Sequence, residues 1–304
     1  MKEKICTTSV RESIDNACCF RPLSNGAMRL IFEITRCCNL HCRHCMVPMK
    51  PDHNTVLNYE RILQMMKELK PNNISKIMIT GGEPLLADGI LDFIAAASQD
   101  DVLVDVNSNL TVVDRKKATR LRQAGVREMT TSLDGTETVH CTIRGNRDCF
   151  RQTVQAIGFL REENIPVDAV CTLMDSNCDQ ITEVVKLAEL LHVSSLTFSG
   201  LIPAGRAKNM IAYYDLNAIR TTLDELRAAS SVPIRTVRLL STDYSACHKG
   251  MDMIGVDHMG YVHPCLQDPL QNTLNLQHHT LAECISFIHG LPSTKCCCYY
   301  SSDI

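Results

Sequence analysis

The chain has 304 residues, of which 45% are hydrophobic and 21% charged, and its formal net charge is −3. A chain of this length can bury one large core, or one large core and a small second one. The charge balance excludes a protein that binds nucleic acid through bulk basicity. The absence of Trp and an aromatic content of 5% also argue against a surface on which bases stack.

Cysteine is unusually frequent, with 17 residues in the chain. Residues 1–11 carry charges and lack the apolar segment of a secretion signal, and we expect no membrane span because no run of about 18 apolar residues occurs. A cysteine-rich chain without an export signal is expected in the cytoplasm. In that compartment clustered thiols indicate metal binding rather than disulfides.

Residues 1–28 form a short extension, and strands and helices then alternate. The pattern predicts strands at residues 29–35, 74–80, 102–107, 126–133, 167–173 and 195–199. Helical periodicity occurs between them, for example at residues 59–69, 150–162 and 182–191. This alternation favours an α/β fold with parallel strands covered by helices. Six units favour an open, TIM-like partial (β/α)6 barrel over a closed eight-fold barrel.

The composition changes after one more predicted helix at residues 215–229 and a strand at 234–240. Six cysteines and four glycines follow between residues 241 and 304. We interpret this part as a small cysteine-rich domain that is organised by metal rather than by a large apolar core. The predicted units are therefore an extension at 1–28, a barrel at 29–235 and a C-terminal domain at 236–304.

Two motifs directly follow the first two predicted strands. Cys38, Cys42 and Cys45 follow the first, and Gly81-Gly82-Glu83-Pro84 follows the second. A cubane [4Fe–4S] cluster normally takes four cysteines, so three would leave one iron open. Because parallel strands end at one edge of a sheet, both motifs are expected at that edge. A zinc site with His41 or His44 is the alternative, but it leaves the second motif unexplained.

Together these motifs resemble the signature of the radical SAM superfamily. The resemblance implies a [4Fe–4S] cluster on the three cysteines, with S-adenosylmethionine at the open iron. One electron then cleaves that cofactor, and the resulting 5′-deoxyadenosyl radical abstracts hydrogen from a substrate. The resemblance also implies cofactor contacts from Gly81, Gly82, Glu83, Ser108, Asn109, Ser132, Asp134 and Arg144. One departure is Leu110, at a position where the family often has glycine.

A second cysteine pattern lies in the C-terminal part. Cys247, Gly260 and Cys265 have the spacing that opens SPASM and twitch domains, and the intervening residues predict a hairpin at 253–263. The resemblance implies one auxiliary [4Fe–4S] cluster, for which we predict Cys296 and Cys298 as the remaining ligands. Adjacent cysteines rarely reach one cubane together, so the choice within the triplet 296–298 stays open. A reduced tail or a zinc knuckle is the alternative.

Most of the other cysteines are expected to be buried structural residues. Two of them are candidate hydrogen-atom donors to a substrate radical. Cys171 lies near the end of the fifth predicted strand, and Cys141 is close in sequence to Arg144.

The first hypothesis for function is maturation of a ribosomally made peptide by epimerisation, thioether formation or C–C crosslinking. The alternatives are a small-molecule dehydrogenase or epimerase acting on an aminocyclitol or sugar, and a non-catalytic redox sensor. The expected partners are the substrate, an electron donor such as flavodoxin or ferredoxin, and a separate peptide-recognition protein. With only 28 residues before the first predicted strand, we expect no fused peptide-recognition domain of the winged-helix kind. Neither nucleic acid nor membrane is expected as a partner.

Overall fold

The computed structural model describes residues 27–47, 57–237, 239, 250–267 and 269–292. Its strands form one nine-stranded sheet in the order β7-β6-β5-β4-β3-β2-β1-β8-β9. All neighbouring strands are parallel except β8 and β9. The strands are β1 (Met28–Thr35), β2 (Ile74–Gly81), β3 (Leu103–Asn107), β4 (Val126–Ser132), β5 (Val167–Thr172), β6 (Ser195–Ser199), β7 (Ile234–Val237), β8 (Met253–Val256) and β9 (Val262–His263).

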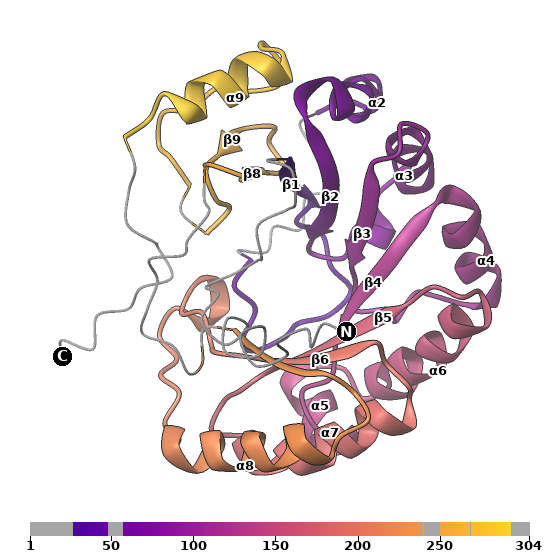
Figure 1. The fold of residues 1–304 in the computed structure, drawn as a ribbon, viewed down its shortest axis with the longest axis vertical. Helices are drawn as coiled ribbons and strands as arrows, with labels where there is room; N and C mark the ends of the chain where they lie inside the picture. The colour runs from indigo at the N-terminus through magenta and orange to yellow at the C-terminus, as the bar shows by residue number, and fades with distance from the viewer. Residues whose placement is uncertain (1–26, 48–56, 238, 240–249, 268, 293–304) are drawn as a thin grey trace, which may run out of the picture.

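The helices lie around the outside of the curved sheet, so that the strands enclose the centre of the molecule (Figure 1). They are α2 (Tyr59–Glu68), α3 (Ile90–Ser98), α4 (Arg115–Ala124), α5 (Glu137–Arg144), α6 (Cys149–Glu162), α7 (Ile181–Leu190), α8 (Leu216–Ala229) and α9 (Leu281–His289). Six β/α units are therefore followed by a seventh parallel strand. This confirms the predicted strand–helix alternation and the partial barrel.

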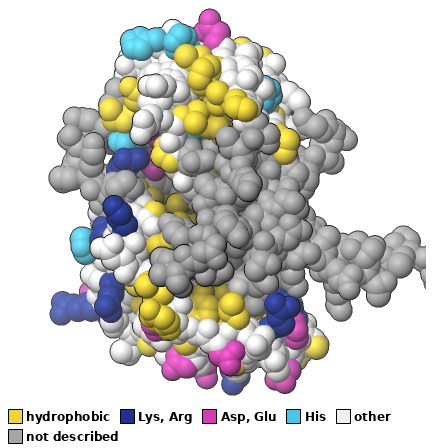
Figure 2. Space-filling model, turned by 90° about the vertical axis from the view of Figure 1, so that its left-hand side faces the viewer, with side chains coloured by type: hydrophobic (Ala, Val, Ile, Leu, Met, Phe, Trp, Pro, Cys, Tyr) yellow, Lys and Arg dark blue, Asp and Glu magenta, His cyan; other side chains and the backbone are white. Residues whose placement is uncertain are grey.

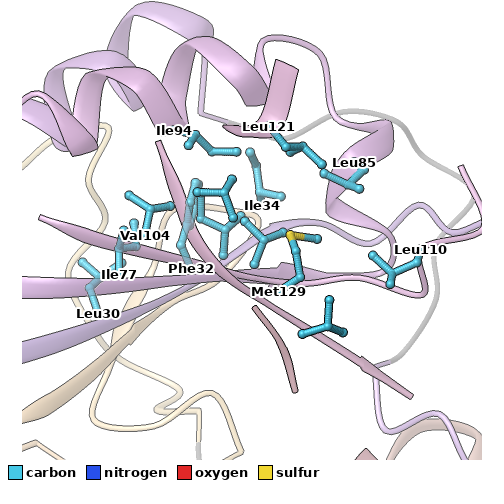
Figure 3. Close-up of a cluster of buried hydrophobic side chains, with 14 of the residues drawn as sticks. Leu30, Phe32, Ile34, Ile77, Leu85, Ile94, Val104, Leu110, Leu121 and Met129 are labelled. Atoms are coloured by element: carbon cyan, nitrogen blue, oxygen red, sulfur yellow. The ribbon is translucent and has the colours of Figure 1, made fainter. Parts of the chain in front are cut away.

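The hydrophobic core lies between the sheet and these helices (Figure 3). In β1, Leu30, Phe32 and Ile34 are at most 1% exposed, and they alternate with Ile31 and Glu33. This period of two places all three on the helix-covered face of the sheet. Full burial of such side chains stabilises the fold by roughly 1.5–3 kcal/mol each.

Charged side chains cross the strands on the opposite, inner face. Asp105 on β3 is buried and accepts hydrogen bonds from Arg127 on β4, Nε to Oδ1 at 2.7 Å and Nη2 to Oδ2 at 2.6 Å. Lys76 on β2 forms an ion pair with the same carboxylate. A single carboxylate therefore joins three neighbouring strands.

The C-terminal part continues the sheet of the barrel. Residues 253–256 form β8, which pairs in parallel with β1, and β9 completes the predicted hairpin. A division of the chain at residue 235 stays a prediction, because the segments on either side of it contribute to one sheet. Cys247, Cys296 and Cys298 lie outside the described residues.

The surface carries both signs of charge. On the face in Figure 2, Lys and Arg side chains and Asp and Glu side chains both occur, and neither sign covers the face. Across the described residues, no helix combines the length and the hydropathy that crossing a bilayer requires.

Candidate active site

The cysteine loop, residues 36–47, follows β1 at the carboxyl edge of the sheet. Cys38, Cys42 and Cys45 are free thiols. They belong to a small apolar cluster with Leu40 that is separate from the main core. Burial raises the pKa of the Cys38 thiol to about 11 and also raises the pKa of Cys45. Metal binding at this loop would therefore have to displace protons from the thiols.

Main-chain hydrogen bonds hold the cysteine loop against two other parts of the barrel. Arg206, in the loop after β6, donates from Nε to the Cys42 carbonyl at 2.7 Å and from its backbone N–H to the Cys45 carbonyl at 2.9 Å. On another side, the Arg144 carbonyl at the end of α5 accepts from His41 N at 3.2 Å. The loop conformation thus depends on residues more than 100 positions away.

The two glycines after β2 pack directly against the start of the cysteine loop. The Gly82 N–H donates to the Thr35 carbonyl at 2.7 Å, and the Glu83 N–H donates to the Cys37 carbonyl at 2.7 Å. A Cβ atom on Gly82 would lie 2.1 Å from the Cys37 oxygen. Gly81 has a φ of +148°, which favours glycine, and a Cβ there would lie 2.3 Å from the Thr35 oxygen. Only glycine fits this contact.

The Glu83 carboxylate is fully buried and holds the segment that follows β3. Its Oε1 accepts from Ser108 Oγ at 2.7 Å and from Leu85 N at 3.0 Å, and its Oε2 accepts from Asn109 N at 2.8 Å. Burial raises the pKa of Glu83 despite these hydrogen bonds. The structure thus brings together three predicted cofactor-binding residues, Glu83, Ser108 and Asn109. The Glu83 carboxylate is hydrogen-bonded to protein groups.

Asn109 connects this segment to the cysteine loop. Its Nδ2 lies 3.8 Å from Cys38 Sγ and 2.9 Å from Asn39 Oδ1. The next residue, Leu110, has a φ of +62° and is fully buried. The backbone here keeps the left-handed conformation that suits glycine, although the residue is leucine.

Asp134 and Arg144 form a buried ion pair beside Cys42. Arg144 Nη2 lies 2.5 Å from Asp134 Oδ2, and Arg144 Nη1 lies 3.6 Å from Cys42 Sγ. Burial alone would raise the pKa of Asp134, but the Arg144 charge outweighs it and the pKa is lowered. Asp134 Oδ1 also accepts from Thr172 N at 3.1 Å. Ser132 lies half-buried at the end of β4, two residues before this pair.

Two histidines lie next to the ion pair: His44, which the sequence suggested only as an alternative zinc ligand, and His140, which the sequence did not suggest as a site residue. His44 Nε2 lies 3.9 Å from Asp134 Oδ2, and His140 Nδ1 accepts from Asp134 N at 3.2 Å. Burial lowers the pKa of each to about 4, opposed by Asp134 and helped by the Arg144 charge. Both are therefore neutral at physiological pH. In the sequence, His140 and Arg144 are spaced so that they share one face of a helix, and this spacing could have identified His140 as a neighbour of the site.

The two candidate hydrogen donors lie in different surroundings. Cys171 is fully buried in the main core with Ala169, on the helix-covered face of β5. This position gives no support to contact with a substrate inside the barrel. Cys141, on α5, is partly exposed, and Cys149 Sγ lies 3.9 Å from its Sγ.

One ligand of the predicted auxiliary cluster lies in the described residues. Cys265 is buried just after β9. The turn before it is held by Asp257, whose Oδ1 accepts from Met259 N and Tyr261 N at 2.9 Å each. Gly260 in this turn has a φ of +87°, which explains the glycine of the motif.

In the described part of the chain, no three His, Cys, Asp or Glu side chains converge as they would around a single metal ion. The thiols of a cubane bind different irons, so they do not need to share one point. Two polar surface hollows, of about 270 and 500 Å³, share Gln277 and His278 and lie beside α2 and the segment after β9. Neither is lined by the cysteine loop, so we do not assign the active site to them.

A profile of the Radical SAM superfamily matches residues 32–191, more than half of the chain, and this range includes the cysteine loop and both glycines. The chain belongs to the radical SAM superfamily. Membership implies a [4Fe–4S] cluster and S-adenosylmethionine as cofactors. The cysteine loop fits such a cluster, because three free thiols share an apolar cluster and N–H groups of Asn109 and Arg144 approach two of the sulfurs.

Two curated radical SAM relatives are similar in sequence. The sporulation killing factor maturation protein SkfB of Bacillus subtilis is 26% identical over 65% of this chain and 48% of its own length. The AdoMet-dependent heme synthase of Nitratidesulfovibrio vulgaris is 27% identical over 62% of this chain and 53% of its own. The chain thus spans about half the length of the curated relatives it matches.

Solved structures show the same fold. Streptococcus suis SuiB bound to S-adenosylmethionine aligns with a TM-score of 0.74 and 14% identity, over 87% of this chain and 68% of SuiB. SuiB bound to its precursor peptide SuiA aligns with the same TM-score and 13% identity, over 87% of this chain and 67% of SuiB. These alignments confirm the α/β fold with a radical SAM type of parallel sheet.

Proposed function

We propose that this chain is a radical SAM enzyme that abstracts hydrogen from a C–H bond of a ribosomally made peptide. The observation that carries the proposal is the meeting of four loops at one edge of the sheet. The segments after β1, β2, β3 and β4 contact one another through Cys37, Glu83, Asn109 and Arg144. When bound there, the cluster and S-adenosylmethionine supply a 5′-deoxyadenosyl radical.

In this proposal Cys38, Cys42 and Cys45 hold the cluster. Arg144 and Asn109 donate hydrogen bonds toward cysteine sulfurs, which would tune the cluster when it is bound. Asp134 fixes the Arg144 guanidinium, and Glu83 fixes Ser108 and the Asn109 backbone. We propose that Gly81, Gly82, Ser108, Asn109 and Ser132 contact S-adenosylmethionine. Cys265 would bind an auxiliary cluster together with Cys247, Cys296 and Cys298.

Peptide as the substrate class is supported by the similarity to SkfB, whose name describes maturation of a sporulation killing factor, and by the fold shared with SuiB, which was solved with its precursor peptide SuiA bound. Inner-face positions such as Thr80, Thr130 and Thr172 are polar and partly exposed. Such a lining suits hydrogen bonding to a peptide backbone. Epimerisation, thioether formation and C–C crosslinking all begin with the same hydrogen abstraction.

A small-molecule substrate is the second candidate. It is favoured by the heme synthase relative and by a GTP 3′,8-cyclase of Helicobacter pylori that is 29% identical over 53% of this chain. A sugar or an aminocyclitol belongs to the same class. The two candidates predict different sources for the hydrogen that enters 5′-deoxyadenosine.

The test of cluster binding is anaerobic reconstitution followed by iron and 5′-deoxyadenosine measurement. We expect about eight irons per chain, falling to about four when Cys38, Cys42 and Cys45 are all replaced by Ala. Cys178→Ala, a partly exposed cysteine remote from both predicted cluster sites in sequence, is the control and should change nothing. Release of 5′-deoxyadenosine from reduced protein distinguishes an enzyme from a redox sensor, which would release none.

The test of substrate class follows deuterium. A peptide encoded next to this chain's gene is prepared with deuterated residues, and deuterium in 5′-deoxyadenosine is measured by mass spectrometry. Transfer from the peptide, and none from deuterated sugar or tetrapyrrole, supports the first candidate. Transfer from a small molecule only would overturn it.

A further inference from the structure

Two cysteines that are not predicted cluster ligands lie next to each other beside the cysteine loop. Cys141 is on the last turn of α5, and Cys149 is the first residue of α6. Their sulfurs are 3.9 Å apart, and both residues belong to the apolar cluster that contains Cys38, Cys42 and Cys45. The turn between the two helices brings the thiols together across a spacing of eight residues.

We propose that Cys141 and Cys149 form a reversible disulfide that changes the packing of α5 against the cysteine loop. The disulfide itself does not depend on the proposed function, whereas its effect on the cluster does. A disulfide needs an S–S distance of about 2.05 Å. The two sulfurs must therefore approach by about 2 Å, which requires a small adjustment of side chains and of the turn.

The different exposure of the two thiols determines which of them reacts first. Cys141 is partly exposed, whereas Cys149 is fully buried. The Cys141 thiolate therefore attacks an external small-molecule disulfide, forms a mixed disulfide and releases one thiol. The Cys149 thiolate then attacks the Cys141 sulfur and releases the second thiol. The pair loses two electrons and two protons, and the external disulfide gains them as two thiols.

The end of α5 would transmit this change to the cysteine loop. Arg144 lies three residues after Cys141 and places Nη1 3.6 Å from Cys42 Sγ. The carbonyls of Ile143 and Arg144 accept hydrogen bonds from Arg43 N at 2.9 Å and His41 N at 3.2 Å. The Cys141 thiol also donates to the Arg147 carbonyl at 3.3 Å, and the disulfide would remove this bond. Oxidation therefore acts on the turn that supports the predicted cluster ligands.

The experiment uses the full chain reconstituted with iron and sulfide under anaerobic conditions. Samples are equilibrated in glutathione buffers with an increasing fraction of the oxidised form, alkylated and digested with trypsin. Cleavage after Arg127, Arg144, Arg147 and Arg151 places Cys141 in peptide 128–144 and Cys149 in peptide 148–151. We expect these two peptides to become disulfide-linked, and the link to disappear when dithiothreitol is added.

Single variants test the order of attack. In Cys149→Ser, Cys141 should accumulate as a glutathione adduct. In Cys141→Ser, Cys149 should stay free, because it is buried. Cys178, also partly exposed, is the internal control, and we expect it to form no cross-link to either peptide. The proposal is overturned if both thiols can still be alkylated in the most oxidising buffer. It is also overturned if iron loading protects both thiols from alkylation although no disulfide link forms between their peptides.

The coupling to the cluster is measured on the same samples. Iron content shows that the cluster is intact, and the resonance of the reduced cluster is followed as S-adenosylmethionine is added. We expect the concentration for half-saturation to differ at least about fivefold between the linked and the dithiol forms. Equal half-saturation would overturn the coupling. Absence of any resonance shift in both forms would instead contradict the proposed function.

Discussion

At the scale of single residues, close backbone contact determines the shape of the candidate site. Gly82 lies against the Cys37 carbonyl, and the Glu83 N–H donates to the same oxygen. The segments after β1 and β2 are joined here with no space for a side chain. This contact explains why a Gly-Gly sequence follows the strand, beyond any contact with a cofactor.

Gly82→Ala should therefore prevent normal assembly of the cysteine loop. The added Cβ would lie 2.1 Å from backbone oxygen, which cannot move away as a flexible side chain could. We expect less than half of the wild-type iron content and a loss of stability of about 1–3 kcal/mol. Gly158→Ala on α6 is the matched control. A Cβ there meets nothing within 4 Å, so this change should stabilise the chain by up to about 1 kcal/mol. Equal iron in both variants would contradict the argument.

Arg144 gives a second prediction at this scale, because its guanidinium reaches a carboxylate and a sulfur at once. Arg144→Ala leaves Asp134 buried without its cation, which costs about 3–5 kcal/mol. Arg144→Lys keeps the charge but has no second N–H arm for Cys42. We expect Lys to restore stability more fully than it restores retention of iron against a chelator. Equal recovery of both quantities would show that the contact with Cys42 has no effect on the cluster.

At the scale of elements, the inner charged network fixes neighbouring strands. Asp105 connects β3 with Lys76 on β2 and Arg127 on β4. The strands carry one apolar face toward the helices, so their inner faces need polar groups that satisfy one another. This network lies within the strands, before the loops of the candidate site begin.

Asp105→Asn should destabilise the chain by about 3 kcal/mol, because Lys76 and Arg127 lose the charge that they share. Glu162→Gln is the control, since its ion pair with Arg115 is more than half exposed and should contribute less than about 1 kcal/mol. Chemical denaturation of the reconstituted protein measures both changes. A loss as small as that of Glu162→Gln would mean that the network adds little to strand pairing.

At the scale of the whole molecule, the C-terminal part is continuous with the barrel. Because β8 pairs with β1, the β8–β9 hairpin that precedes Cys265 lies directly beside the strand that the cysteine loop follows. A cluster at Cys265 would thus be held on the same rigid sheet as the first one.

Cys265→Ala is expected to lower the iron content from about eight to about four per chain, and to leave the first cluster in place. Cys284→Ala is the matched control, because Cys284 is equally a buried cysteine of the C-terminal part, on α9. It should keep all the iron. Identical iron in the two variants would remove Cys265 from the ligands.

The sequence by itself was enough for the strand–helix alternation and for the two motifs that follow β1 and β2. Hydrophobic periodicity is local, and the ends of parallel strands share one edge, so these features need no knowledge of distant contacts. The same period of two also predicts that Cys171 points into the core, because it shares one face of β5 with Val167 and Ala169.

Only the tertiary structure decided which groups each side chain meets. The contact of Arg144 with Asp134 and Cys42, the bonds of Glu83 to the segment after β3, and the approach of Cys141 to Cys149 depend on helix placement. The pairing of β8 with β1 likewise joins residues more than 200 positions apart. Such contacts follow from packing between elements, and no local pattern in the chain specifies that packing.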